Sequence, residues 1–262
     1  MADGSSSSFS HGEVCDTLWA RVVRAIRRTD TSTFDPRAPK RVLEIDGMSG
    51  TKFRIFINEL LYRYTKTYLE VGVWKGSTFC NAIFGNLGTV SKAICVDDWS
   101  GFGGPKGDFL KNLDMALASD SKAADRVKVI NEDFFKTKEV TDEDFRDCQI
   151  YFFDGPHKKE DHKKSITHVA SKMSDEFILV VDDWNWLGVR EGTLDGLEEC
   201  GFKVYKSVEI RSSVDNEHVK DTKKAQKQWW NGCWIAVVSR TESSGEKHFF
   251  GPDKIDVVHE LV

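Results

Sequence analysis

The sequence predicts an α/β protein with a Rossmann-like, mostly parallel seven-stranded sheet, helices on both faces and an antiparallel last strand. Short apolar runs recur along the chain, and glycine or acidic residues follow them. Helix-compatible stretches separate most of these runs, and strands that alternate with helices favour a parallel sheet covered on both faces. The runs predicted as strands are residues 67–73, 91–99, 127–135, 149–157, 176–186, 202–210 and 233–240.

The chain ahead of the first strand divides into three parts. Residues 1–12 are rich in serine and glycine, which is typical of a disordered tail. Residues 13–40 comprise an amphipathic helix over 13–28 and a polar linker with two prolines. Residues 41–262 are expected to form a single domain of ordinary size. Within that domain, residues 53–63 resemble a second helix.

Composition narrows the classes of function. The chain has 262 residues, of which 37 are Lys or Arg and 42 are Asp or Glu, so its net charge is 37 − 42 = −5. This balance disfavours general nucleic-acid binding, which needs a basic field. No apolar run approaches the length of a membrane span, the start lacks a secretory signal, and the scattered cysteines indicate reduced thiols. We therefore expect a cytoplasmic protein without a membrane or nucleic-acid partner.

A glycine turn follows the first predicted strand. Gly72 and Gly76 allow a sharp turn and a close approach of a ligand to the backbone, and a helix is expected to begin near Ser77. Asp97 ends the next strand, where an acid can accept hydrogen bonds from both hydroxyls of a ribose. The pattern predicts a nucleoside-containing cofactor; the alternative is a plain strand-to-helix turn beside a surface acid.

Two residues of this turn argue against a nicotinamide dinucleotide. Trp74 replaces the middle glycine of the G-x-G-x-x-G fingerprint, and Glu70 would repel a pyrophosphate. A carboxylate there suits a cationic ligand instead, such as the amino group or the sulfonium of S-adenosylmethionine.

Acidic residues end two later strands. Asp154 follows one strand, and Asp182 and Asp183 follow the next. Neighbouring parallel strands lie about 4.8 Å apart, so these carboxylates can surround one ion. Hard oxygen ligands favour Mg²⁺, Mn²⁺ or Ca²⁺ over zinc, and we expect Mg²⁺ or Mn²⁺. Such an ion can bind a substrate oxygen and lower its pKa. Alternatively, these acids only cap turns.

His157 lies three residues after Asp154 and is the candidate general base, because its ordinary pKa is near neutrality. The alternative is a loop histidine at the start of a lysine-rich helix. Segment 211–232 is polar and lysine-rich and is expected to be a loop over the sheet or a lid. Tryptophans near strand ends and in this segment could form aromatic walls or simply pack the domain.

These motifs resemble the class I S-adenosylmethionine-dependent methyltransferases, especially metal-dependent catechol O-methyltransferase-like and macrocin O-methyltransferase or cephalosporin hydroxylase-like members. The resemblance implies that His157, where that family commonly has lysine, and Asp154 are catalytic. It implies that Asp154, Asp182 and Asp183 hold a divalent metal. The cofactor-binding residues implied by the resemblance and by position are Glu70, Gly72, Trp74, Gly76, Ser77, Asp97, Asp98, Trp99, Asp133 and Phe134.

The resulting expectation is a divalent-metal-assisted methyltransferase that acts on an oxygen of a small molecule. The alternatives are a metal-dependent hydrolase, lyase or oxygenase on the same fold, or a non-catalytic nucleoside-binding module. Homo-oligomer formation and the identity of the acceptor stay open at this point.

Overall fold

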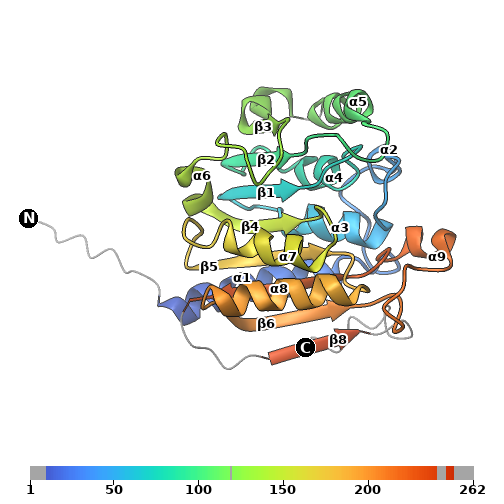
Figure 1. Cartoon of the computed structure of the whole chain (residues 1–262). Coiled ribbons are helices and arrows are strands. Elements are labelled where there is room, and N and C mark those ends of the chain that lie inside the picture. Colours follow the sequence, from blue (N-terminus) through green and yellow to red (C-terminus); the bar gives the residue numbers. More distant parts are fainter. Residues whose placement is uncertain (1–9, 119, 241–245, 251–262) are drawn as a thin grey trace, which may run out of the picture.

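The computed structural model describes residues 10–118, 120–240 and 246–250 (Figure 1). Within these residues one eight-stranded sheet has the order β3-β2-β1-β4-β5-β7-β6-β8. Only β7 runs antiparallel to its neighbours in this described sheet. The strands are β1 (Thr67–Val71), β2 (Lys92–Val96), β3 (Val127–Ile130), β4 (Cys148–Phe153), β5 (Glu176–Asp182), β6 (Lys203–Ile210), β7 (Cys233–Ser239) and β8 (Glu246–Phe250).

The predicted fold class is therefore confirmed, with one difference in the strand count. All seven predicted strands form, and the strand from 233 is the antiparallel one. The eighth strand, β8, pairs in parallel with β6 at the edge of the sheet. Its five residues come after the last apolar run that the sequence pattern marks, so no periodic signal identified it.

Helices cover both faces of the sheet (Figure 1), with α7 and α8 in front and α1 and α3 behind. Alternate strand residues supply the two sides: Phe152 belongs to one apolar cluster and Phe153 to the other. The helices are α1 (His11–Arg27), α2 (Lys40–Leu43), α3 (Thr51–Leu60), α4 (Phe79–Ile83), α5 (Lys106–Leu117), η1 (Ser121–Arg126), α6 (Asp142–Asp147), α7 (Lys159–Thr167), α8 (Leu187–Glu199) and α9 (Thr222–Lys227).

The amphipathic N-terminal helix packs against the domain. α1 contacts α3, β5 and β7, and its buried residues join the apolar cluster behind the sheet. It starts at His11, earlier than the predicted residue 13, because Ser10 and Glu13 form a capping box. Residues 1–9 of the predicted tail lie outside the described residues. The division of the chain into tail, linker and domain stays a prediction.

β4 and β5 end sooner than the predicted ranges 149–157 and 176–186, so the loops that follow them begin earlier in the chain. β4 stops at Phe153, ahead of Gly155 and Pro156, although the predicted strand range continues to 157. β5 stops at Asp182, because Asp183 has a positive φ of 54° and cannot continue a strand. Asp154 and Asp183 therefore lie on turns at the carboxyl edge of the sheet, and Asp182 is the last residue of β5. No helix in the described part of the chain is long and apolar enough to cross a membrane.

Candidate active site

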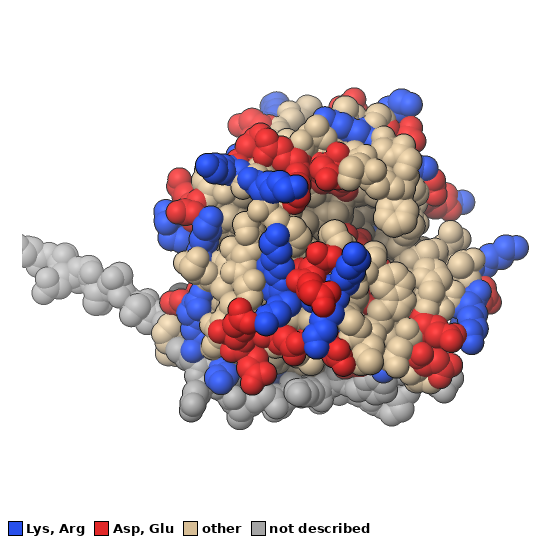
Figure 2. Space-filling view, viewed as in Figure 1, with Lys and Arg blue, Asp and Glu red and all other residues tan. Residues whose placement is uncertain are grey.

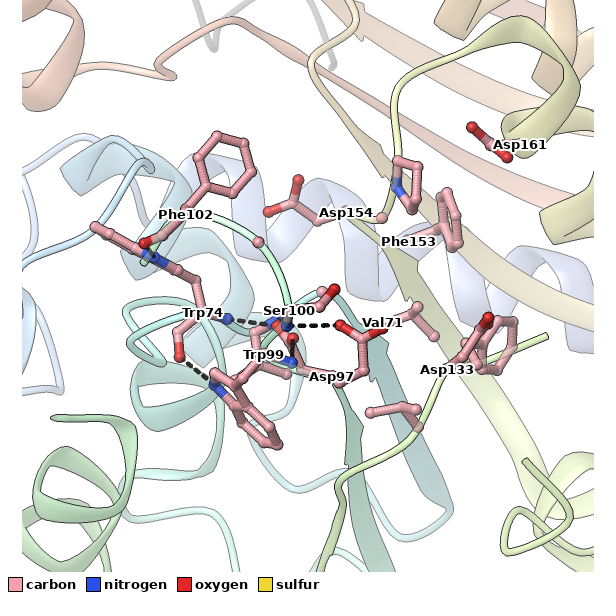
Figure 3. A pocket seen from close by; sticks show the side chains of 18 of the residues that line it. Val71, Trp74, Asp97, Trp99, Ser100, Phe102, Asp133, Phe153, Asp154 and Asp161 are labelled. Atoms are coloured by element: carbon pink, nitrogen blue, oxygen red, sulfur yellow. Dashed lines mark hydrogen bonds between the residues drawn. The ribbon is translucent and has the colours of Figure 1, made fainter. Parts of the chain in front are cut away.

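A cavity of about 650 Å³ opens at the carboxyl ends of β1 to β4. Figure 2 shows a hollow in the upper half of this face, walled largely by uncharged residues, and Figure 3 shows the cavity from close by. This is the edge at which parallel α/β sheets bind ligands. The lining residues are 48–49, 71–74, 77–78, 96–102, 132–136, 153–157, 161 and 164.

Gly72 allows the turn after β1, which forms one wall of the cavity. Its φ is +85°, and a Cβ atom added there would lie 1.9 Å from the backbone oxygen of Asp154. The backbone of β1 also hydrogen-bonds to both neighbours at this point: Gly72 N–H donates to Val96 O at 3.0 Å and Asp154 N–H to Val71 O at 2.8 Å. The turn and the Asp154 loop therefore touch through backbone atoms, which only glycine permits.

Asp97 organises the wall after β2. Its Oδ2 accepts hydrogen bonds from the N–H groups of Val73 and Trp74 at 2.7 and 2.8 Å, and its Oδ1 accepts one from Trp99 N–H at 2.6 Å (Figure 3). The indole N–H of Trp99 donates to Trp74 O at 2.8 Å. A carboxylate offers about four lone-pair sites, so Asp97 keeps acceptor capacity toward the cavity.

Several other predicted cofactor residues line the same cavity, namely Trp74, Ser77, Asp98, Trp99, Asp133 and Phe134. Ser77 Oγ lies 3.0 Å from Ser49 Oγ, which ties the turn to the loop before α3. Asp133 forms a 2.7 Å ion pair with Lys136, and its pKa is lowered first by the hydrogen bond from that lysine.

Glu70 and Gly76 are not among the lining residues. Glu70 is fully buried, accepts hydrogen bonds from Thr78 Oγ1 and from Tyr68 OH, and has its pKa raised by burial to about 8. Gly76 has a φ of +80° and packs against the ring of Phe109. These two residues support the turn in this structure, and a direct contact with a cofactor stays a prediction.

The sequence reasoning missed part of the wall. Met48 and Ser49 come from the loop before α3, far from any strand end, so no strand-end rule could find them. Phe102 is 73% exposed and has a positive φ of 48°, and its carbonyl accepts a hydrogen bond from the Trp74 indole at 3.1 Å. Phe102 was not missed in the same way, because it belongs to the glycine-rich stretch 101–107 after Asp97, which the sequence predicts as a wall over the cofactor.

The structure brings Asp154, His157 and Asp183 together, with one ligand atom of each within 4.8 Å of the others. His157 Nε2 lies 2.9 Å from Asp183 Oδ2 and 3.7 Å from Asp154 Oδ1. Burial alone would lower the pKa of His157, but the two carboxylates outweigh it and raise the pKa to about 10. Of these three residues, Asp154 and His157 also line the cavity.

Asp182 lies beside this cluster without joining it. Its side chain is buried, and among the described residues its Oδ1 has no hydrogen-bond partner. Burial, followed by the charges of Asp154 and Asp183, raises its pKa well above the ordinary value. Burial likewise raises the pKa of Asp154 to about 6. The assignment of Asp182 as a metal ligand therefore stays a prediction, with His157 as the third donor in the observed geometry.

The donor set fits a divalent cation. With Asp154 and Asp183 ionised and His157 neutral, the three possible ligands carry a charge of −2. Buried acids without compensation are costly, and a cation with two positive charges balances this count. Two carboxylates and an imidazole suit Mg²⁺ or, with its greater tolerance of nitrogen, Mn²⁺.

A family model matches the part of the chain that builds this site. Residues 69–184 match the family model described as a methyltransferase domain. A comparison with curated proteins finds no match.

The chain is also similar to solved structures. The cofactor-bound protein Rv0187 from MTB is 15% identical, with a TM-score of 0.49 and coverage of 87% of this chain and 91% of that one. The O-methyltransferase from Bacillus cereus in complex with SAH is 10% identical, with a TM-score of 0.47 and coverage of 87% and 96%. The SAH-bound Podospora anserina methyltransferase PaMTH1 is 14% identical, with a TM-score of 0.48 and coverage of 90% and 99%.

The matched segment runs from β1 to the turn after β5, and so contains every strand end that builds the cavity. The sheet around this segment is mostly parallel, with β7 as the antiparallel strand among the described residues. Residues 69–184 are therefore similar to a methyltransferase domain, and the sheet to which they belong has the predicted Rossmann-like, mostly parallel order.

Proposed function

We propose that the protein transfers a methyl group from S-adenosylmethionine to an oxygen of a small molecule, with a divalent cation held by Asp154 and Asp183. The observation that supports this most is that the Asp97 turn and the Asp154–His157 loop line the same cavity; Figure 3 shows Asp97 and Asp154 in it. A cofactor bound along the first would direct its reactive end toward the second.

The cofactor half of the cavity suits a nucleoside. Asp97 has acceptor capacity for ribose hydroxyls, as acids at the end of the second strand of such sheets do. Phe134 lies on the wall that follows β3 and offers an apolar ring surface for adenine. The volume of about 650 Å³ is within the usual range for small-molecule sites.

The other half suits proton removal from an acceptor hydroxyl. A bound divalent cation supplies Lewis acidity, which makes a hydroxyl more acidic. His157 can accept that proton only in its neutral form and with its accepting nitrogen not bound to the cation, so we assign the cation to Asp154 and Asp183. Its raised pKa has the Asp154 and Asp183 charges as its cause, so neutralising those charges lowers it toward the working range.

The residues around the reacting atoms mainly position and enclose them. Methyl transfer needs the sulfonium carbon and the acceptor oxygen in line, and close positioning accounts for much of the rate gain. We propose a small-molecule acceptor rather than a nucleic acid, because the surface of α7 and α8 alternates in charge through pairs such as Lys159–Glu191 and Lys163–Glu199 (Figure 2). We propose Mg²⁺ or Mn²⁺ as the cation.

The test is an acceptor screen that follows formation of S-adenosylhomocysteine by mass spectrometry, with Mn²⁺ or with a chelator present. The proposal expects turnover of a hydroxylated acceptor that stops when the metal is removed. Turnover that continues unchanged in chelator would refute the metal role. If S-adenosylhomocysteine forms only with acceptors that are methylated on nitrogen, the proposed oxygen target is refuted.

A further inference from the structure

Segment 211–232, whose role the sequence left open, reaches the carboxylate cluster through two side chains. Asn231 is 1% exposed, and its Nδ2 donates to Asp183 Oδ1 at 2.7 Å and lies 2.8 Å from His218 Nδ1. His218 is exposed and lies between Trp186 and Trp230, at ring-centroid distances of 6.2 and 5.9 Å. Two hydrogen bonds therefore connect Asp183 through Asn231 to His218 at the surface.

The hydrogen bonds determine the orientation of the Asn231 amide and which nitrogen of His218 accepts. The Oδ1 atom of Asn231 accepts the backbone N–H of Val219 at 2.9 Å, so the amide oxygen must face that way. Its NH₂ group then points at Asp183 and His218, and both of its hydrogens have an acceptor. His218 Nδ1 accepts, which places the ring proton of the neutral form on Nε2.

The consequence concerns the two oxygens of Asp183. Oδ1 is occupied by Asn231, while Oδ2 faces His157 at 2.9 Å. Asp183 has a positive φ, and the loop after it is held to segment 211–232 by backbone bonds such as Asn185 N–H to Asn231 O at 3.0 Å. Without the Asn231 amide, the carboxylate can rotate and present either oxygen.

We propose that Asn231 is a positioning residue for the cation ligand Asp183, and that His218 fixes Asn231 in turn. This inference rests on the proposed function, because it assumes that Asp183 holds a cation. It goes further by giving segment 211–232 a specific role, in which its side chains set the orientation of one ligand and thereby the affinity for the metal. A residue that orients a metal ligand by a hydrogen bond typically contributes 10- to 100-fold to the affinity for the metal.

The experiment measures Mn²⁺ binding by calorimetry to the full chain, and S-adenosylhomocysteine binding to the same samples. Asn231→Ala is expected to weaken Mn²⁺ binding by about tenfold or more. His218→Phe, which keeps a ring and removes the acceptor, is expected to weaken it about twofold to tenfold, the range of one hydrogen bond. His218→Gln, whose side-chain oxygen can accept from Asn231, is expected to restore it.

The matched control is Glu217→Gln. Glu217 neighbours His218, is 56% exposed and pairs with Lys220. The control and all variants should bind S-adenosylhomocysteine as the parent does, because these residues do not line the cofactor cavity.

The outcomes separate the two proposals. Unchanged Mn²⁺ affinity in both Asn231→Ala and His218→Phe overturns the positioning role, and since His218 is exposed, its variant tests the inference even if Asn231→Ala does not fold. No Mn²⁺ binding by the parent overturns this inference and the metal part of the proposed function. Absent S-adenosylhomocysteine binding with normal Mn²⁺ binding refutes the methyl-transfer proposal alone.

Discussion

Replacing Gly72 with alanine tests whether the close contact between the first turn and the Asp154 loop builds the site. The added Cβ atom would lie 1.9 Å from Asp154 O, whereas real Cβ contacts stay beyond 3.0 Å, so the two backbones must separate by about 3.0 − 1.9 = 1.1 Å. The positive φ of 85° adds strain for any side chain. We expect strain of about 1 kcal/mol and overpacking of about 1–3 kcal/mol.

Gly201→Ala is the matched control. Gly201 also has a positive φ, of 72°, but a Cβ there meets nothing within 4 Å. The control therefore carries the strain without the clash. The difference of about 1–3 kcal/mol corresponds to a Tm that is lower by about 2–12 °C in Gly72→Ala than in Gly201→Ala.

The assays are thermal unfolding and calorimetric binding of S-adenosylhomocysteine and Mn²⁺. Because the separation moves both the turn and Asp154, Gly72→Ala should lose affinity for both ligands, while Gly201→Ala keeps both. Equal Tm values and equal affinities in the two variants would refute the reasoning.

Three further changes probe individual groups. Asp97→Asn should weaken S-adenosylhomocysteine binding by about tenfold or more, because the new amide nitrogen cannot accept hydrogen bonds from the N–H groups of the turn. The control Asp108→Asn on α5 should leave that binding unchanged. Equal binding by the two variants would contradict the role of Asp97. Glu70 has its pKa raised from 4.5 to about 8, so the folded state retains a proton that the unfolded state has lost, and stability falls as pH rises from about 4.5 to 8. Glu70→Gln should therefore raise Tm relative to the parent at pH above 8 and lose that advantage near pH 5; a constant Tm difference across this range would speak against it. Burial lowers the pKa of His162 to about 3, so the parent should lose stability as pH falls below 6.5. Thermal unfolding at pH 7 and at pH 5 should show a smaller loss of stability for His162→Phe. Equal losses in the two proteins would argue against a buried neutral histidine.

Much of the fold could be predicted from periodicity. The strands β1, β2, β4, β5 and β7 are largely buried apolar runs, and a strand buried on both faces is the pattern that a covered sheet produces. β8 lacked this signal, because an edge strand with charged residues has no continuous apolar run. The start of α1 depended on a capping box that overlaps the serine-rich tail.

The site was predictable where it depends on strand ends and less so where it depends on loops. Asp97 and Asp154 directly follow strands, His157 lies three residues after Asp154, and all three line one cavity. Glu70 shows the limit: the last residues of a strand alternate between faces, and one position decides whether a carboxylate faces a ligand or Tyr68. The contact of Asn231 with Asp183 joins residues 48 positions apart, which no local pattern reveals.

The most direct test of the central claim is calorimetric binding of S-adenosylhomocysteine to the parent and to Asp97→Asn, each with and without Mn²⁺. The account predicts micromolar binding to the parent, a large loss in Asp97→Asn, and Mn²⁺ binding that survives in both proteins because Asp97 does not belong to the Asp154–His157–Asp183 cluster. An absence of S-adenosylhomocysteine binding to the parent under either condition, or equal binding by the two proteins, would contradict the account.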